Sequence, residues 1–169
     1  RNMTMSSMRF RNSGGNTFSS ALRVSFERSS CVMLGLLAPK PIAVASYPNT
    51  SYAHQGWLSE DQAYFFLDDE GDEIAGTVPK TRTIVWEVSK LDEPVLQVEF
   101  LGTTSASDHN LYIKGNYMYQ SDYVAGLRVI DVKDPKAPRE VGFFDTVPAG
   151  ENVPGFAGSW SNYPYFKSG

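Results

Sequence analysis

The second half of the sequence repeats itself. Residues 85–100 align with residues 129–144 at a constant offset, because the proline that both segments share lies at positions 94 and 138, and 138 − 94 = 44. Both segments read as an apolar run, an acidic residue, a turn, a proline and another apolar run. Similarity at a fixed spacing indicates stacked structural units, and no other feature of the chain constrains its fold as strongly.

The repeat extends upstream with a different offset. His54 aligns with His109, and Tyr64 in the next apolar segment aligns with Tyr119, both at 109 − 54 = 119 − 64 = 55. Because 55 − 44 = 11, we expect an insertion in the first unit between positions 67 and 83, where the acidic residues 68–73 lie. A third copy is expected to begin near residues 157–160, and a partial copy near position 41.

Each unit has the size and pattern of one blade of a β-propeller. Its four short apolar segments are separated by turn residues, in the range of about 40 to 50 residues that is typical of a blade. The aromatic content of 13% also favours strands. We therefore predict an all-β chain in which residues 38–169 form an incomplete β-propeller of about two to three blades with open edges. A β-sandwich is the alternative.

Residues 1–37 do not share this pattern. Ser, Asn, Gly and Arg dominate there, so we expect a poorly ordered or unrelated segment. Cys31 is the one cysteine of the chain, which excludes an internal disulfide and a cysteine-rich zinc site.

Charge and motif content narrow the classes of function. The net charge of −4 and pI of 5.1 offer no basic face to nucleic acid or to an anionic membrane. No apolar run reaches the roughly 18 residues of a membrane span. Neither a G-x-S-x-G nucleophile motif nor a phosphate-binding G-x-x-x-x-G-K motif occurs, so no catalytic residue is predicted.

The two histidines occupy equivalent positions of successive units. They could face one channel and, with Asp108, hold a divalent metal or act as acid and base. Alternatively, they and the adjoining amides hydrogen-bond neighbouring blades, which we favour because metal sites usually need three or four ligands. The aromatic residues of each unit could likewise stack on sugars or peptides or simply pack between blades. The candidate binding residues are His54, Gln55, Trp57, Asp108, His109, Asn110, Tyr112 and Trp160.

The acidic insertion suggests a calcium loop, since hard cations take six to eight oxygen ligands. The EF-hand template fails, because Glu73 stands where it needs glycine and Pro79 where it needs glutamate. A solvated acidic loop is the favoured alternative. The candidate calcium ligands are Asp68, Asp69, Glu70 and Asp72.

Several phrases together resemble the choice-of-anchor B family, whose members carry LVIVD repeats. They are YAHQGW (52–57), LDDE (67–70), DHNLY (108–112), YVAGLRVID (123–131), VGFFDT (141–146) and GSWSNYPYF (158–166). The resemblance covers about residues 41–166, with Leu127–Asp131 as the LVIVD-like core. It implies a β-propeller exported to the cell surface or beyond, with varied carboxyl-terminal anchors.

Three functions are consistent with these features. The leading hypothesis is a non-catalytic surface or secreted module that binds a protein or glycan and needs no cofactor. The alternatives are a metal-dependent hydrolase or lyase with its site at the channel, and a structural spacer in a larger surface protein. Open sheet edges are expected to pair with the remaining blades of a longer chain or with another copy.

Overall fold

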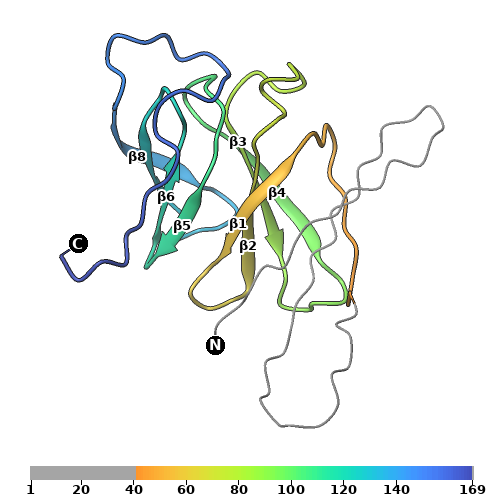
Figure 1. The fold of residues 1–169 in the computed structure, drawn as a ribbon. Helices are drawn as coiled ribbons and strands as arrows, with labels where there is room; N and C mark the ends of the chain where they lie inside the picture. The colour runs from red at the N-terminus through yellow and green to blue at the C-terminus, as the bar shows by residue number, and fades with distance from the viewer. Residues whose placement is uncertain (1–40, 169) are drawn as a thin grey trace, which may run out of the picture.

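The computed structural model describes residues 41–168, and the predictions made for residues 1–37 and Cys31 lie outside this range. In the described residues every regular element is a strand (Figure 1). The first four strands are β1 (Ala53–Leu58), β2 (Tyr64–Asp69), β3 (Arg82–Glu87) and β4 (Val95–Leu101). The other four are β5 (Leu111–Lys114), β6 (Tyr117–Ser121), β7 (Leu127–Asp131) and β8 (Arg139–Phe144).

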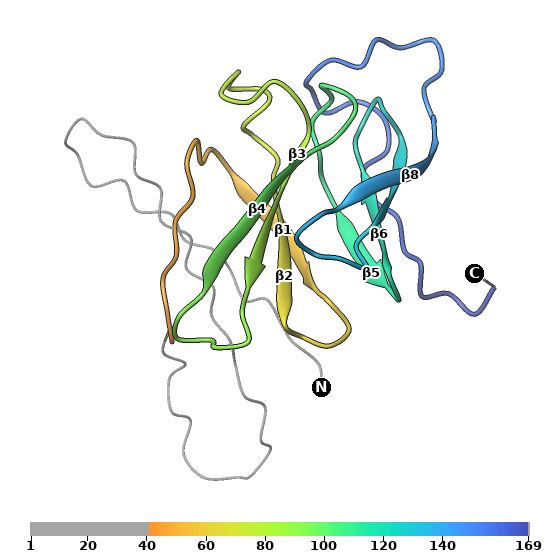
Figure 2. The same ribbon diagram turned by 180° about the vertical axis from the view of Figure 1, so that it is seen from behind.

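The strands form two four-stranded sheets. Strands β1 to β4 pair in chain order in one sheet and β5 to β8 in the other, and every pairing is antiparallel. Figure 2 shows the two sheets side by side from behind. This architecture confirms the predicted all-β fold with four-stranded antiparallel units.

The strand register shows which positions of the two sheets are equivalent. Phe66 pairs with Trp57 and Val85, as Tyr119 pairs with Tyr112 and Val129. Phe66 and Tyr119 are therefore equivalent, at an offset of 119 − 66 = 53, between the 55 of the first strands and the 44 of the third. The insertion is thus divided, with two residues (55 − 53) in the β1–β2 turn and nine (53 − 44) between β2 and β3.

This division corrects the alignment of Tyr64 with Tyr119. Tyr64 pairs with Glu87, and Tyr117 pairs with Asp131, so Tyr117 is the equivalent of Tyr64. The error arose because the β1–β2 and β5–β6 turns differ in length by two residues, which preserves the inward and outward alternation of a strand and so leaves the hydrophobic pattern unchanged.

The main core lies between the two sheets. One face of the first sheet contributes Phe66 and Val85, and the facing side of the second contributes Leu111, Met118 and Ile130, all at most 1% exposed. Strands β1 and β5 contact each other across this interface. They are the strands that would line the channel of a propeller.

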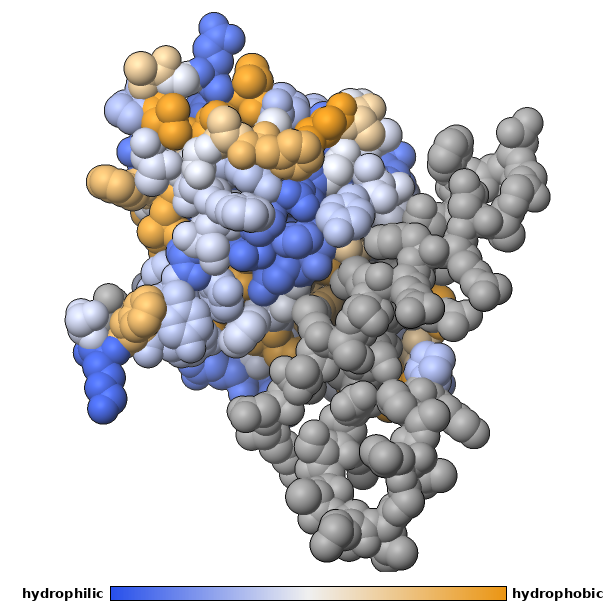
Figure 3. Space-filling model, in the orientation of Figure 1, coloured by the Kyte–Doolittle hydropathy of each residue, from blue (hydrophilic) through white to orange (hydrophobic). Residues whose placement is uncertain are grey.

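The two sheets differ in how their other faces are covered. The outer face of the first sheet packs against a second core that includes Tyr47, Leu67, Ile84 and Trp86. In the second sheet, Tyr119 and Val129, the equivalents of Phe66 and Val85, are only half-buried, and Phe144 on the edge strand β8 is 68% exposed. Figure 3 shows apolar residues (orange) beside hydrophilic ones (blue) on the surface of the molecule. The second sheet therefore has one covered face and one open face.

The segment after β8 contains no strand up to residue 168. It crosses back over the second sheet and makes one bridge, between Tyr123 and Ser159, where the third unit was predicted to begin. No helix in residues 41–168 is long and apolar enough to cross a membrane.

Candidate functional site

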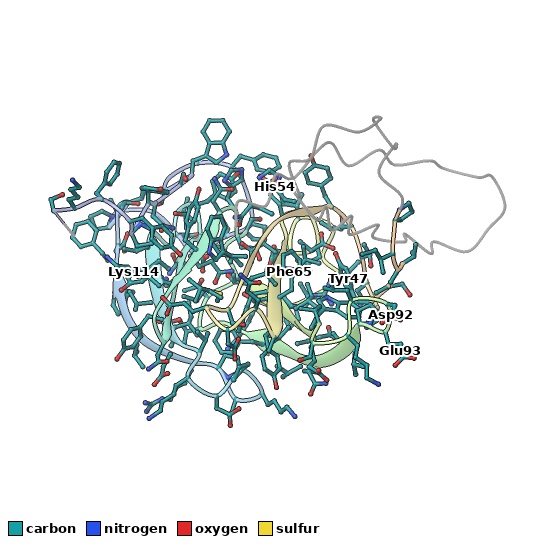
Figure 4. All side chains as sticks on the ribbon, turned by 90° about the horizontal axis from the view of Figure 1, so that it is seen from below. Tyr47, His54, Phe65, Asp92, Glu93 and Lys114 are labelled. Atoms are coloured by element: carbon teal, nitrogen blue, oxygen red, sulfur yellow. The ribbon has the colours of Figure 1, made fainter. Side chains whose placement is uncertain are left out.

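Loops from both sheets meet at one end of the molecule. The start of β1, the loop after β2, the residues before β5 and the loop after β6 all lie at the upper end in Figure 1. His54 enters from β1, Glu70 directly follows β2 and His109 precedes β5. Figure 4 shows His54 at an edge of the molecule, whereas Phe65 lies in its interior.

His54, Glu70 and His109 form a group of three potential metal ligands. One donor atom from each lies within 4.8 Å of the other two. The Glu70 carboxylate is 3.5 Å from His54 Nδ1 and 3.8 Å from His109 Nε2, and the two imidazole centroids are 4.3 Å apart. The two histidines lie close together, as the less favoured of the two interpretations expected, but the carboxylate between them is Glu70 and not Asp108.

Trp160 fixes the orientation of His109. The Trp160 carbonyl oxygen lies 2.5 Å from His109 Nδ1, and the Trp160 indole N–H donates to His109 Nε2 at 2.6 Å. A carbonyl only accepts, so Nδ1 carries the proton and Nε2 keeps its lone pair. Burial lowers the pKa of His109, and the nearby His54 lowers it further, which favours this neutral form.

Two backbone features hold Trp160 in this place. Ser159 N–H donates to the Tyr123 carbonyl at 2.8 Å. Gly158 has a φ of +115°, and a Cβ at this position would overlap the same carbonyl. Glycine is therefore needed where the segment passes over the β6–β7 loop.

Tyr123 is a second neighbour of Glu70. Its hydroxyl donates to Glu70 Oε1, and its ring contacts His109 edge to face. Burial raises the pKa of Tyr123, and the bond to Glu70 raises it further, so the hydroxyl remains a donor. Glu70 and Tyr123 occupy equivalent positions, because they differ by the offset of 53 between β2 and β6 (123 − 70 = 53). The two units therefore contribute different residues to one site.

The acidic stretch is buried, which makes the prediction of a solvated loop wrong. Its acidic residues Asp68, Asp69, Glu70, Asp72 and Glu73 are all at most 8% exposed. Their cation is the first residue of β3: Arg82, 1% exposed, pairs with Asp72 at 2.6 Å and with Glu99 at 2.6 Å. A charge run alone does not reveal such a buried partner.

The four candidate calcium ligands do not converge. Asp69 accepts from the Tyr47 hydroxyl and from the N–H groups of Ser51 and Tyr52, and Asp72 binds Arg82. Asp68 accepts from Gln120 at 2.8 Å, and Glu70 faces the histidines. These contacts give each carboxylate a different partner, so the predicted oxygen-only set is not assembled.

Asp108 lies away from the imidazoles, among other carboxyl groups. It is fully buried, and neither carboxylate oxygen has a hydrogen-bond partner. Burial raises its pKa well above the ordinary value, and the charges of Asp68, Glu73 and Asp122 raise it further. Asp108 is adjacent to His109 in sequence, but its side chain points the other way, because adjacent residues point to opposite sides of an extended chain.

The amides next to the histidines connect units, as the favoured interpretation proposed. Gln55 donates to the Leu111 carbonyl at 2.9 Å and accepts from the Leu111 N–H at 2.8 Å. Asn110, its equivalent in the second unit, donates to the Ser161 hydroxyl at 3.1 Å. The amide of the first unit thus binds the second unit, and the amide of the second unit binds the segment after β8.

The aromatic residues form a connected surface. The ring centroids of Trp57 and Tyr112 are 5.0 Å apart, and those of Tyr112 and Tyr163 are 5.7 Å apart. Tyr163 therefore continues this row in the third segment, whereas Trp160, predicted for that place, packs on His109 at 5.3 Å. Spacing alone misassigned Trp160 because the third segment forms no strand that would fix its register.

A family model matches one of the two units. The LVIVD repeat family matches residues 107–146, which contain β5 to β8 and both His109 and Tyr123. A search of curated proteins gives no match. Since the first sheet is equivalent to the matched unit strand by strand, the chain carries repeat units of the β-propeller type.

Proposed function

We propose that this chain is part of a ligand-binding β-propeller in a surface or secreted protein of the choice-of-anchor B kind, and that it binds an uncharged glycan without catalysis. One observation carries the proposal, namely a row of aromatic rings across three segments of the chain, which is half-buried in the two units and exposed in the last segment. Rows of tryptophan and tyrosine rings that are bordered by solvent-accessible polar groups suit ligands that have both apolar and polar groups.

The row begins in the two units and continues into the last described segment. Beyond Tyr112 and Tyr163 it includes Tyr165, 5.5 Å from Tyr163, and Phe166, 5.0 Å from Tyr163. Tyr163, Tyr165 and Phe166 are 50%, 38% and 64% exposed. Water therefore reaches these rings, and a ligand that covers them gains burial of apolar area.

Polar groups border the rings. Lys114 donates to the Pro164 carbonyl at 2.7 Å, and Trp57 Nε1 donates to the Tyr165 hydroxyl at 3.1 Å. A sugar ring offers C–H faces to aromatic rings and hydroxyls to such a border. The net charge of −4 disfavours strongly anionic ligands, which is why an uncharged glycan is the better fit.

A glycan array probed with the full chain tests the proposal. The strongest neutral glycan is then titrated against Tyr163→Ala and Phe166→Ala, with Phe144→Ala on β8 as a matched exposed control. We expect each of the first two variants to weaken binding by about tenfold, and the control to leave it unchanged.

Mass spectrometry of the recovered glycan tests the absence of catalysis, because the ligand should keep its mass. A flat array contradicts glycan binding. Capture of a defined protein that depends on Tyr163 and Phe166 would replace the glycan with a protein ligand.

A further inference from the structure

We infer that His54, Glu70 and His109 form a binding site for a divalent transition-metal ion such as Zn²⁺. The proposal is independent of the aromatic row and of its ligand. It rests on the number, chemistry and spacing of the donors, on the tautomer of His109 and on the surrounding hydrogen bonds.

The spacing of the donors matches a metal with small adjustments. Ligands held at about 2.1 Å in a tetrahedron lie about 3.4 Å from each other. Glu70 Oε2 is 3.5 Å from His54 Nδ1, Glu70 Oε1 is 3.8 Å from His109 Nε2, and one donor atom of each residue lies within 4.8 Å of the other two. Side-chain movements of on the order of 1 Å therefore bring the three donors to the required distances.

The chemistry of the donors selects the class of ion. Two imidazoles and one carboxylate suit Zn²⁺ and its neighbours, whereas Ca²⁺ and Mg²⁺ require oxygen ligands. Three protein ligands leave one position for an oxygen of water or of a ligand, the arrangement typical of functional rather than structural zinc sites. This set shares only Glu70 with the candidate calcium ligands Asp68, Asp69, Glu70 and Asp72.

The second layer of hydrogen bonds fits a metal ligand. Metal-binding histidines commonly donate their other N–H to a carbonyl or carboxylate, which fixes the ring. His109 Nδ1–H donates to the Trp160 carbonyl, and the Tyr123 hydroxyl donates to Glu70. The Tyr123 hydroxyl occupies Glu70 Oε1, so Glu70 Oε2, 3.5 Å from His54 Nδ1, is the oxygen left to bind a metal.

Trp160 competes with the metal for His109. Its indole N–H donates to the Nε2 lone pair at 2.6 Å, so binding requires this bond to break and the N–H to turn to water. The Trp160 side chain is able to move outward because the residue is 65% exposed. Loss of this one hydrogen bond lowers the free energy of metal binding by a modest amount. It also changes the surroundings of the indole, so that metal binding alters the fluorescence of Trp160.

The test uses the full chain, purified without a polyhistidine tag and stripped with chelator. Zn²⁺ is titrated by calorimetry and by tryptophan fluorescence, and Co²⁺ by its visible absorption. We expect one ion per chain and the intense tetrahedral absorption of Co²⁺. His54→Ala and His109→Ala should each weaken binding by at least about 100-fold.

Two further variants separate ligation from folding. Trp160→Phe keeps a ring on His109 but removes the competing N–H, so it should tighten Zn²⁺ binding about threefold or more. Glu93→Gln, an exposed acid far from the site in Figure 4, is the matched control and should change nothing.

If His109→Ala fails to fold, His54→Asn and the imidazole ¹⁵N shifts of the unaltered chain give the same answer. Zinc should shift one nitrogen of each of the two histidines. Weak binding that survives loss of either histidine, or Zn²⁺ that leaves both rings unshifted, overturns the proposal.

Discussion

The two sheets have the same strand order and register but different burial. Strand β3 of the first sheet is buried at five successive positions, whereas its equivalent β7 alternates between buried and half-buried positions. The first sheet is covered on both faces and the second on one. The comparison shows that burial in a repeat depends on the number of neighbours a unit has, and not on its own sequence pattern alone.

The largest difference in stability between the two sheets is expected for substitutions at equivalent core positions. Phe66→Ala empties a fully buried site between the sheets and should lower the free energy of unfolding by about 3 to 5 kcal/mol. Tyr119→Ala, at the equivalent half-buried position, should cost about 1 kcal/mol, because its ring faces the open side. Urea unfolding measures both. Equal losses would mean that the open face is covered in solution.

The insertion should give the first sheet a pH dependence of its own. Burial and the charge of Asp72 raise the pKa of Glu73 to about 9. Since this exceeds the ordinary value of 4.5, the folded chain binds a proton that the unfolded chain releases, so stability is full below about pH 4.5 and falls as the pH rises toward 9.

We expect the free energy of unfolding to decrease by on the order of 2 kcal/mol across this range, measured by denaturation at several pH values. Glu73→Gln should reduce the slope of the profile and leave the part that comes from the raised pKa of Asp108, whereas the exposed Glu93→Gln should leave the slope unchanged. A profile that rises between pH 5 and pH 8 would show that Glu73 is ionised in the folded chain.

The smallest expected difference in stability is between the two amides that connect units. Gln55→Ala leaves both backbone groups of the buried Leu111 without a partner and should cost about 1.5 kcal/mol. Asn110→Ala breaks one exposed side-chain bond and should cost less than about 0.5 kcal/mol. Thermal unfolding resolves the difference, and equal shifts in melting temperature would show that the two connections are equivalent.

The repeat, the four strands per unit and the proximity of the two histidines were predictable from the sequence, because spacing and alternation carry that information. The partners of the acidic residues were not. Arg82 lies nine residues beyond Glu73, and nothing local marks it as the cation that the insertion encloses. Glu70 was named as a candidate ligand among the other acidic residues, and its proximity to the histidines was not predictable, since only the fold brings the end of β2 to His109.

Gln55 also bears on how such a chain can grow by duplication. Its amide recognises the backbone of Leu111, and every residue except proline presents the same N–H and C=O groups. The hydrogen bonds between the two units therefore do not depend on which side chain stands at position 111, whereas the packing of Leu111 in the core between the sheets does. A copied unit thus keeps the hydrogen bonds of this contact after a substitution at position 111, provided that the new residue is not proline.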